Sequence, residues 1–257
     1  MESFPVTFIE PKLFWTKGFF VIVGPSGSGK TTIIKTALKD PRKYIGGLPD
    51  KGATLWVFVG ASHDLQRELE PELDASVFTD VRFVSERAGD CTELLAALEK
   101  STAGDTSHCI FIDDYMSYGR KDFILIKNLL HTYKRHETLC TVVALHNLRR
   151  DKVGAVPEMV EFADRILFTK TTGNVGNVAA LLAKMEVPKC VQQPLRKEFA
   201  ADRGLPPEKK RYGVAVFDRT SSMIISDYRA LSEGVAQRMM YCYGEWISRP
   251  TLMRTPC

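Results

Sequence analysis

Short apolar runs without polar alternation recur along the first 170 residues of the chain. They predict strands at residues 19–23, 54–60, 109–114, 139–146 and 164–169, with a shorter strand at 81–86. Apolar residues at helical spacing predict helices at 30–40, where Pro41 ends the pattern, at 90–100 and at 121–135. Apolar strands that alternate with helices are typical of a mainly parallel sheet covered by helices on both faces. The pattern therefore predicts an α/β fold.

The sequence changes in character after about residue 187. Two segments there, at 187–199 and 203–213, are rich in proline and basic residues. A hairpin of Val214–Phe217 with Met223–Ser226 and a helix near 231–243 are expected to follow. We predict a core domain at 1–187 and a small basic C-terminal extension at 188–257, made of the hairpin and the helix and packed on the core.

Composition excludes several classes of protein. A chain of 257 residues with 44% hydrophobic and 26% charged residues is globular rather than disordered or fibrous. No apolar run reaches the roughly 20 residues that a bilayer span needs. The first residues include acidic side chains and no basic region before an apolar stretch, so no secretory signal is expected. The six cysteines are scattered without a CxxC pair, which favours a reducing compartment, and we expect no membrane contact.

Charge is distributed unevenly along the chain. The formal net charge of +4 is too small to indicate a nucleic-acid partner by itself. Residues 189–257, however, carry 12 basic and 7 acidic side chains. A basic C-terminal part is compatible with contact to phosphates, and it is also compatible with an ordinary solvated surface.

A glycine-rich segment between the first strand and the first helix carries the strongest motif. Residues 24–31, GPSGSGKT, match the P-loop (Walker A) pattern GxxxxGK[ST] at every fixed position. In such a loop, backbone N–H groups surround the phosphates, Lys30 reaches the β- and γ-phosphates, and the Thr31 hydroxyl ligates Mg²⁺. The sequence therefore predicts a P-loop NTPase, of the ASCE type, that uses ATP and Mg²⁺. The residues expected to bind ATP are Gly24, Pro25, Ser26, Gly27, Ser28, Gly29, Lys30, Thr31 and Thr32.

Two adjacent acids, Asp113 and Asp114, end the apolar strand at 109–114. A carboxylate at the carboxyl end of a parallel strand lies at the crevice where such sheets bind ligands. One acid there can hold Mg²⁺, and the second can orient and deprotonate a water that attacks the γ-phosphate. Such a pair is suited to hydrolysis, although two solvated acids that cap the next helix would give the same pattern.

The next strand ends in His146-Asn147, whose polar side chains are expected at the same crevice. Asn147 is our first choice for a residue that contacts both the γ-phosphate and the attacking water, and His146 is the alternative. Arg149 and Arg150 follow after one residue, Leu148. An arginine near a γ-phosphate neutralises charge in the transition state, but these two are equally compatible with a surface loop.

Three segments together, GPSGSGKT (24–31), IFIDDYM (110–116) and VVALHN (142–147), resemble the viral genome-packaging ATPases of the FtsK–HerA superfamily. Residues 110–151 also resemble the adenovirus packaging protein, and the resemblance as a whole covers roughly residues 18–170. It implies that Asp113 is the metal acid, Asp114 the catalytic acid and Asn147 the sensor. Poxvirus-type members often carry an arginine after a proline that follows the sensor, where this chain has Val160. Arg149, Arg150 and Arg165 are therefore the candidates for an arginine finger.

The resemblance further implies an ATP-driven motor, usually a homo-oligomeric ring, that packages double-stranded DNA without sequence preference into a capsid. Capsid or portal proteins would be its partners, and the host nucleus or cytoplasm, or the virion, its location. Two alternatives stay open from the residues: a P-loop nucleotide or nucleoside kinase, and an assembly or transcription factor that binds ATP and DNA with little hydrolysis. DNA-stimulated ATP turnover would separate the motor from both.

Overall fold

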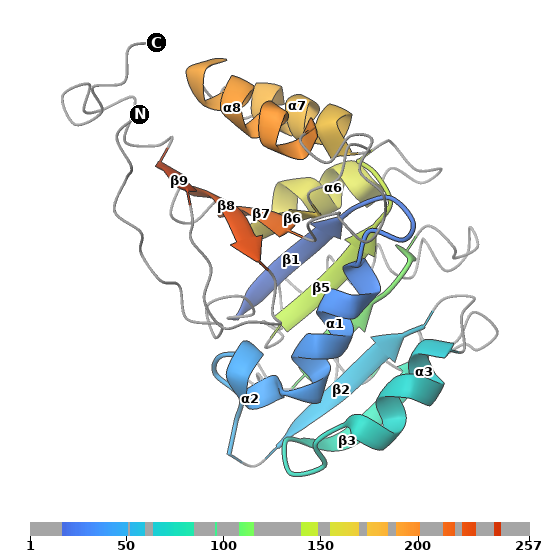
Figure 1. The fold of residues 1–257 in the computed structure, drawn as a ribbon. Helices are drawn as coiled ribbons and strands as arrows, with labels where there is room; N and C mark the ends of the chain where they lie inside the picture. Colours follow the sequence, from blue (N-terminus) through green and yellow to red (C-terminus); the bar gives the residue numbers. More distant parts are fainter. Residues whose placement is uncertain are drawn as a thin grey trace.

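The computed structural model describes residues 17–50, 52–59, 64–84, 96, 108–115, 140–148, 155–169, 174–184, 189–200, 213–218, 223–229 and 239–242 (Figure 1). The strands are β1 (Gly18–Val23), β2 (Ala53–Phe58), β3 (Phe78–Val84), β4 (His108–Ile112), β5 (Cys140–Leu145), β6 (Arg165–Thr169), β7 (Gly213–Asp218), β8 (Met223–Arg229) and β9 (Met239–Cys242). The helices are α1 (Lys30–Lys39), α2 (Pro41–Tyr44), α3 (Asp64–Leu69), α6 (Ala155–Phe162), α7 (Val175–Lys184) and α8 (Lys189–Ala200), with a 3₁₀ turn, η2 (Glu70–Glu72), after α3.

The nine strands within the described residues belong to one sheet, in the order β3-β2-β4-β5-β1-β6-β7-β8-β9. The first six strands in this order are parallel to one another, and β7, β8 and β9 continue the sheet antiparallel from β6. β5 lies between the P-loop strand β1 and the acidic strand β4. The predicted α/β fold with a mainly parallel sheet is confirmed.

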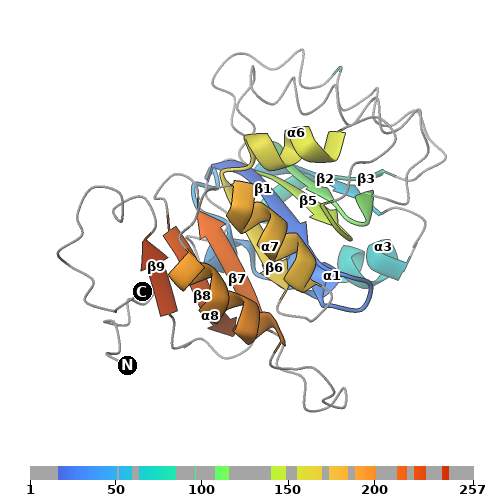
Figure 2. The ribbon, with the colours of Figure 1, turned by 90° about the horizontal axis from the view of Figure 1, so that it is seen from above.

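Helices cover both faces of the sheet (Figures 1 and 2). Alternate residues of each central strand point to opposite faces. Phe20 of β1 belongs to the core that includes Leu38 of α1, whereas Phe19 belongs to the core that includes Met159 of α6. The first core also holds buried residues of α2 and α3, and the second holds those of α7 and α8. Burial on both faces explains why the strands show no polar alternation.

Pro41 ends α1 as the sequence predicts, but it also begins a short second helix. Proline is well placed in the first turn of a helix, because its missing N–H would have no intrahelical partner there. α2 therefore follows α1 after a single residue, Asp40. Of the helices expected at 90–100 and 121–135, only Ala96, which is helical, lies within the described residues.

The C-terminal part of the chain is joined to the core through the sheet itself. The predicted hairpin is confirmed as β7 and β8, and β7 pairs with β6 along Arg165–Thr169. The prediction of a helix near 231–243 is wrong for residues 239–242, because these residues form β9 and pair with β8. Residues 231–238 lie outside the described residues. The exposed edge of β8 provides backbone partners that override the helical spacing of the apolar residues there.

Residues 189–200, which the proline-rich composition did not mark as a helix, form α8 with Pro194 inside it. Phe199 of this helix is fully buried, and its ring meets that of Phe168 edge to face, with centroids 6.4 Å apart. Tertiary packing of this kind outweighs the low helix propensity of one proline. Among the described residues, no helix is both long and apolar enough to cross a membrane.

Candidate active site

The P-loop links the end of β1 to the start of α1, as the motif requires. Gly27 and Gly29 have positive φ angles of 70° and 91°, a backbone conformation that side chains with a Cβ rarely adopt. The loop begins at Gly24, whose N–H donates a hydrogen bond of 2.9 Å to the carbonyl of Leu145 in β5. The loop is therefore tied at its start to the neighbouring strand, and its turn depends on glycine at two positions.

Gly24 is required for a different reason, namely space. A Cβ at this position would stand 2.2 Å from Thr169 Oγ1 and 2.3 Å from Ser28 Oγ. Real Cβ atoms essentially never approach other atoms this closely, and the near part of Thr169 includes its own Cβ at 3.2 Å. Two hydroxyl side chains, one from the loop and one from the end of β6, therefore occupy the place of a side chain at residue 24.

Lys30 is folded back onto the loop that precedes it. Its Nζ donates hydrogen bonds to the carbonyl oxygens of Gly24, at 2.7 Å, and Pro25, at 3.1 Å. The residue is only 6% exposed. Burial lowers the pKa of Lys30, and the negative charges of Asp113 and Asp114 oppose that shift. The ammonium group therefore sits in the phosphate-binding loop, held by two neutral acceptors that a charged phosphate oxygen can replace.

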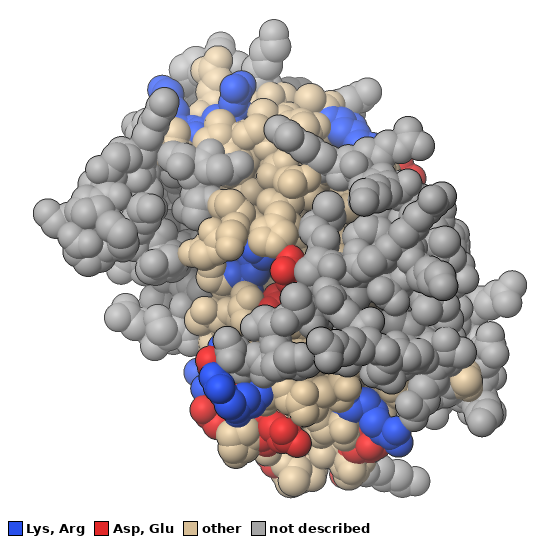
Figure 3. Space-filling view, turned by 90° about the vertical axis from the view of Figure 1, so that its right-hand side faces the viewer, with Lys and Arg blue, Asp and Glu red and all other residues tan. Residues whose placement is uncertain are grey.

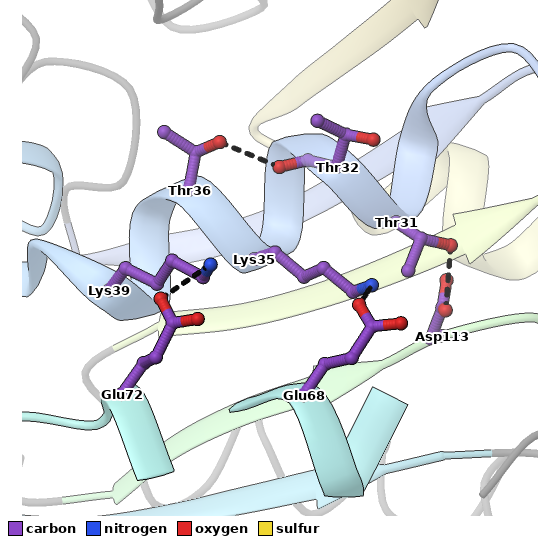
Figure 4. A network of polar contacts seen from close by, with 8 residues as sticks. All are labelled: Thr31, Thr32, Lys35, Thr36, Lys39, Glu68, Glu72 and Asp113. Carbon is purple, nitrogen blue, oxygen red and sulfur yellow. Dashed lines mark hydrogen bonds and ion pairs between the residues drawn. The ribbon is translucent and has the colours of Figure 1, made fainter. Parts of the chain in front are cut away.

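Thr31 and Asp113 form the second feature of the site. Thr31 Oγ1 donates a hydrogen bond of 2.8 Å to Asp113 Oδ2, across from α1 to the end of β4 (Figure 4). Mg²⁺ binds oxygen ligands at about 2.0–2.1 Å in octahedral geometry, in which neighbouring ligands stand about 2.9 Å apart. The spacing and the chemistry of these two oxygens therefore fit a shared Mg²⁺ ion.

The surroundings of Asp113 also fit a cation. The residue is 8% exposed, and desolvation raises the pKa of its carboxyl group. The hydrogen bond from Thr31 and the charge of Lys30 lower the same pKa, while the adjacent Asp114 raises it. No cluster of three or more His, Cys, Asp or Glu side chains that could hold a metal occurs among the described residues. Mg²⁺ is commonly bound by one or two protein groups together with substrate phosphates, which agrees with this arrangement.

Asp114 lies next to Asp113 but has a different environment. Its backbone has a positive φ of 47°, which is uncommon for a residue other than glycine. Its Oδ1 lies 2.6 Å from Nε2 of His146, the residue that follows β5. Because β4 and β5 are adjacent and parallel, their carboxyl ends bring the two side chains together. The carboxylate of Asp114 is thus oriented by the imidazole of His146.

A pocket of about 190 Å³ joins these groups. The residues that line it are Ser26, Gly27, Lys30, Thr31, Lys35, Val59, Leu65, Asp113, Asp114 and His146. Polar side chains from the P-loop, α1 and the ends of β4 and β5 therefore converge on one space. This is the arrangement expected for nucleotide phosphates, a metal ion and a water molecule.

Among the remaining candidates that the structure describes, Asn147, Thr32 and Arg165 are not among the residues that line this pocket. Of the two residues after β5, His146 lines the pocket, while Asn147 is half-buried and is not among the lining residues. Thr32 is exposed, and Figure 4 shows it on the side of α1 away from Thr31. Arg149 and Arg150 lie outside the described residues. Arg165 begins β6, at the end of that strand away from the P-loop, with its guanidinium 5.9 Å from the centre of the Phe20 ring.

Two residues near the site, Lys35 and Asn174, were not singled out from the sequence. Lys35 lines the pocket, and helical spacing could have identified it, because it lies one turn after Thr31 on the same face. Asn174 is fully buried, and its Nδ2 donates to the carbonyl oxygens of Val23, at 2.9 Å, and Thr169, at 2.7 Å. No pattern in the sequence distinguishes Asn174 from a loop asparagine.

Asn174 begins a chain of hydrogen bonds behind the P-loop. Its Oδ1 accepts from Asn177 Nδ2 at 3.1 Å, and Asn177 Oδ1 accepts from the N–H of Leu148 at 3.3 Å. The chain therefore connects the end of β1, the end of β6 and the first turn of α7 to the segment that follows His146.

No protein-family model matches the chain, and no curated protein matches it. Among the solved structures that are similar to it is the genome packaging NTPase B204 from Sulfolobus turreted icosahedral virus 2, in complex with ATPγS. The two chains share 16% sequence identity, with a TM-score of 0.47, and the match covers 84% of this chain and 96% of that one. The function of the present chain is therefore inferred from its own residues.

Proposed function

We propose that the chain is an ATPase that binds Mg²⁺ and ATP at the P-loop and hydrolyses the γ-phosphate. The observation that carries this proposal is the convergence of Lys30, Thr31, Asp113, Asp114 and His146 on one pocket. The group includes a phosphate-binding cation, two oxygen ligands and a carboxylate held by an imidazole. Catalysis of phosphoryl transfer depends mainly on such positioning and on electrostatic stabilisation.

Each residue has a role that its contacts suggest. Lys30 would exchange its bonds to Gly24 and Pro25 for oxygens of the β- and γ-phosphates. Thr31 and Asp113 would hold Mg²⁺, which when bound neutralises charge on the phosphates. Asp114 would orient a water molecule and accept its proton, with His146 fixing the direction of the carboxylate.

The test of this proposal compares Lys30→Ala with Asp114→Asn. Lys30→Ala should abolish ATP binding or turnover, whereas Asp114→Asn should still bind ATP and hydrolyse it poorly. The measurements are phosphate release and equilibrium binding of labelled ATP. Lys39→Ala, in the same helix but outside the pocket lining, is the matched control and should behave as wild type. Wild-type turnover by Asp114→Asn would remove this residue from the chemistry.

We further propose that ATP hydrolysis drives movement of double-stranded DNA into a viral capsid. The resemblance of three sequence segments to packaging ATPases is the main support. Arg196 and Lys197 of α8 add to it, because both are exposed. Figure 3 shows described basic side chains at the upper end of the molecule, which is the end where α7 and α8 lie in Figure 1. Capsid or portal proteins would then be its partners, in the host cell or the virion.

Salt dependence tests the DNA contact. Binding to phosphates releases counterions, and each neutralised phosphate contributes about 0.9 to the slope of log affinity against log salt. Arg196→Ala/Lys197→Ala should flatten this slope and reduce stimulation of the ATPase by duplex DNA, without changing basal turnover. Replacement of Lys209, Lys210 and Arg211, a second basic cluster that lies outside the described residues, is a parallel test. An unchanged slope in both variants would contradict phosphate contact by these clusters.

We propose that the active form is a ring in which one subunit completes the site of the next. Within the described residues, no arginine lines the pocket. An arginine supplied from a neighbour contributes roughly 10³ to 10⁵ in rate where it acts. Arg149 and Arg150 are the first candidates for this arginine, because they follow His146 closely in the sequence. Mixing Arg149→Ala/Arg150→Ala subunits with Lys30→Ala subunits should restore part of the activity, and a mixture without activity would contradict the idea.

A nucleotide or nucleoside kinase is the main alternative, and a nucleoside acceptor assay separates it from an ATPase. Phosphate that appears on a nucleoside, rather than in solution, would support the kinase. An ATP- and DNA-binding factor with little hydrolysis would show neither product above background. We expect free phosphate, because an oriented carboxylate beside the metal site activates water.

A further inference from the structure

One side of α1 carries three polar contacts at successive turns of the helix (Figure 4). Thr31, Lys35 and Lys39 are spaced by four residues, so they share one face of the helix. Thr31 contacts Asp113 of the acidic strand end, Lys35 is paired with Glu68 of α3, and Lys39 is paired with Glu72 of η2 at 2.5 Å. The row therefore runs from the metal-binding end of the site to the outer end of α1.

Lys35 differs from Lys39 because it also lines the nucleotide pocket. Its side chain is 22% exposed, compared with 40% for that of Lys39. The charged side chains among the described lining residues are Lys30 and Lys35 against Asp113 and Asp114. Lys35 is thus a second cation of the pocket, and its present partner, Glu68, is 51% exposed and is not among the lining residues.

The strengths of the two possible partners favour an exchange. An ion pair as exposed as Lys35–Glu68 contributes little free energy, because water screens it and two long side chains are held in place. A phosphate oxygen in a partly enclosed pocket also accepts a charge-assisted hydrogen bond, and solvent screens that contact less than it screens an exposed pair. Lys35 can therefore leave Glu68 at small cost when a phosphate reaches the pocket.

The position of Lys35 indicates which phosphate of a bound nucleotide it would contact. Lys35 follows Thr31 by one turn on the face that meets Asp113 at the end of β4, beside Asp114. In the proposed reaction, the phosphate nearest to these two acids is the one that water attacks. A diphosphate lacks this group, so contact with Lys35 would distinguish a nucleoside triphosphate from a diphosphate.

We propose that Lys35 is a further phosphate-binding residue, which exchanges Glu68 for the terminal phosphate of a bound nucleoside triphosphate. This inference rests on the proposed ATPase function. Glu68 then acts as a competing anion, and release of its partner frees α3 from α1 at that contact. The pair therefore ties the contact between α1 and α3 to the presence of the terminal phosphate.

The proposal makes opposite predictions for the two members of one ion pair. Lys35→Met keeps most of the apolar stem and removes the charge, so affinity of the full-length protein for Mg²⁺–ATPγS should fall on the order of tenfold, with ADP affinity changed less than about twofold. Glu68→Gln removes the competing anion, so ATPγS affinity should rise by about twofold or more. Lys39→Met and Glu72→Gln are the matched controls from the next turn, and neither should change either affinity.

Equilibrium titrations of wild type and the four variants with fluorescent ATPγS and ADP decide the matter, with thermal unfolding of each variant as a check on folding. If Lys35→Met unfolds, the predicted rise of ATPγS affinity in Glu68→Gln still tests the proposal. A loss of ATPγS affinity in Glu68→Gln, or equal affinities in all variants, would overturn the role of Lys35 and leave the ATPase proposal intact. Failure of folded wild-type protein to bind either nucleotide would overturn the ATPase proposal, and this inference with it.

Discussion

The carboxylate of Asp114 and the imidazole of His146 meet across the ends of two neighbouring strands, with 2.6 Å between Oδ1 and Nε2. The contact with His146 fixes the direction of the Asp114 carboxylate, whereas the neighbouring Asp113 accepts a hydrogen bond from Thr31. The two adjacent aspartates are thus separated in role by the elements they contact.

His146→Ala should lower the turnover number by about tenfold to a hundredfold while leaving ATP affinity nearly unchanged, because the change acts on the orientation of Asp114. Steady-state phosphate release, analysed for kcat and KM separately, measures this. His146→Gln keeps a hydrogen-bond donor and should recover part of kcat. Asn147→Ala is the comparison variant, and a larger loss in Asn147→Ala than in His146→Ala would return the sensor role to Asn147.

Asp113→Asn should stabilise the metal-free protein at neutral pH while weakening the binding of Mg²⁺–ATP. Burial raises the folded-state pKa of Asp113 above its ordinary value of 3.8, so folding disfavours the ionised form. The wild-type carboxylate therefore lowers stability above its folded pKa, and this penalty disappears as the pH falls through that pKa toward 3.8. Melting temperatures of both proteins against pH, in chelator, should show a gap at pH 7 that closes on acidification.

An unchanged gap across that pH range would contradict the assignment of the penalty to Asp113. Asp80→Asn is a suitable control, since Asp80 is paired with Arg82 on an exposed part of β3. The same measurement with Mg²⁺ and ATP should reverse the order of the two melting temperatures, because a charged carboxylate binds the cation more tightly than a neutral amide.

Gly24→Ala should be more damaging than Gly27→Ala, although both lie in the P-loop. Alanine at 24 would collide with Thr169 and Ser28, and such overpacking typically costs about 1–3 kcal/mol. Gly27 has a positive φ of 70° but nothing within 4 Å of an added Cβ, so alanine there carries only backbone strain, about 1 kcal/mol. Urea unfolding and ATP binding of the two variants test this order, and equal losses would contradict it.

Asn174→Ala should destabilise the protein by about 1–3 kcal/mol, since it removes a hydrogen-bond donor from the buried carbonyl oxygens of Val23 and Thr169. Asn177→Ala, which removes a half-buried link of the same chain, should cost about 1 kcal/mol. Chemical denaturation gives both values. Asn174→Ala should also weaken ATP binding, because Val23 directly precedes the P-loop. Stability loss without any change in nucleotide binding would limit Asn174 to a structural role.

The central strands and the P-loop could be predicted from the sequence because each depends on local signals. β1, β4 and β5 are buried on both faces, so their apolar runs identify them without knowledge of their neighbours. The P-loop requires glycine at positions that the motif itself fixes. The end of β4 could be predicted in the same way, because two aspartates follow its apolar run.

The parts that the sequence did not reveal depend on contacts between distant residues. β9 pairs with β8 although its apolar spacing favours a helix, and α8 is held through Phe199 although it contains a proline. In the pocket, the choice between His146 and Asn147 depends on which side chain faces β4, and adjacent residues in a strand end cannot be separated by composition. Lys35 becomes notable only when α3 and the acidic strand are placed beside α1.

The crowding around Gly24 has a consequence for how this sequence can change through evolution. A side chain at residue 24 needs space that Ser28 and Thr169 now fill, so a substitution there is tolerated only after both of those side chains become smaller. Thr169 in turn contacts Asn174, at 3.1 Å between Oγ1 and Nδ2. These positions are energetically coupled, and coupled positions do not accept changes one at a time. Among descendants of this chain, we therefore expect residues 24, 28 and 169 to be inherited as a unit.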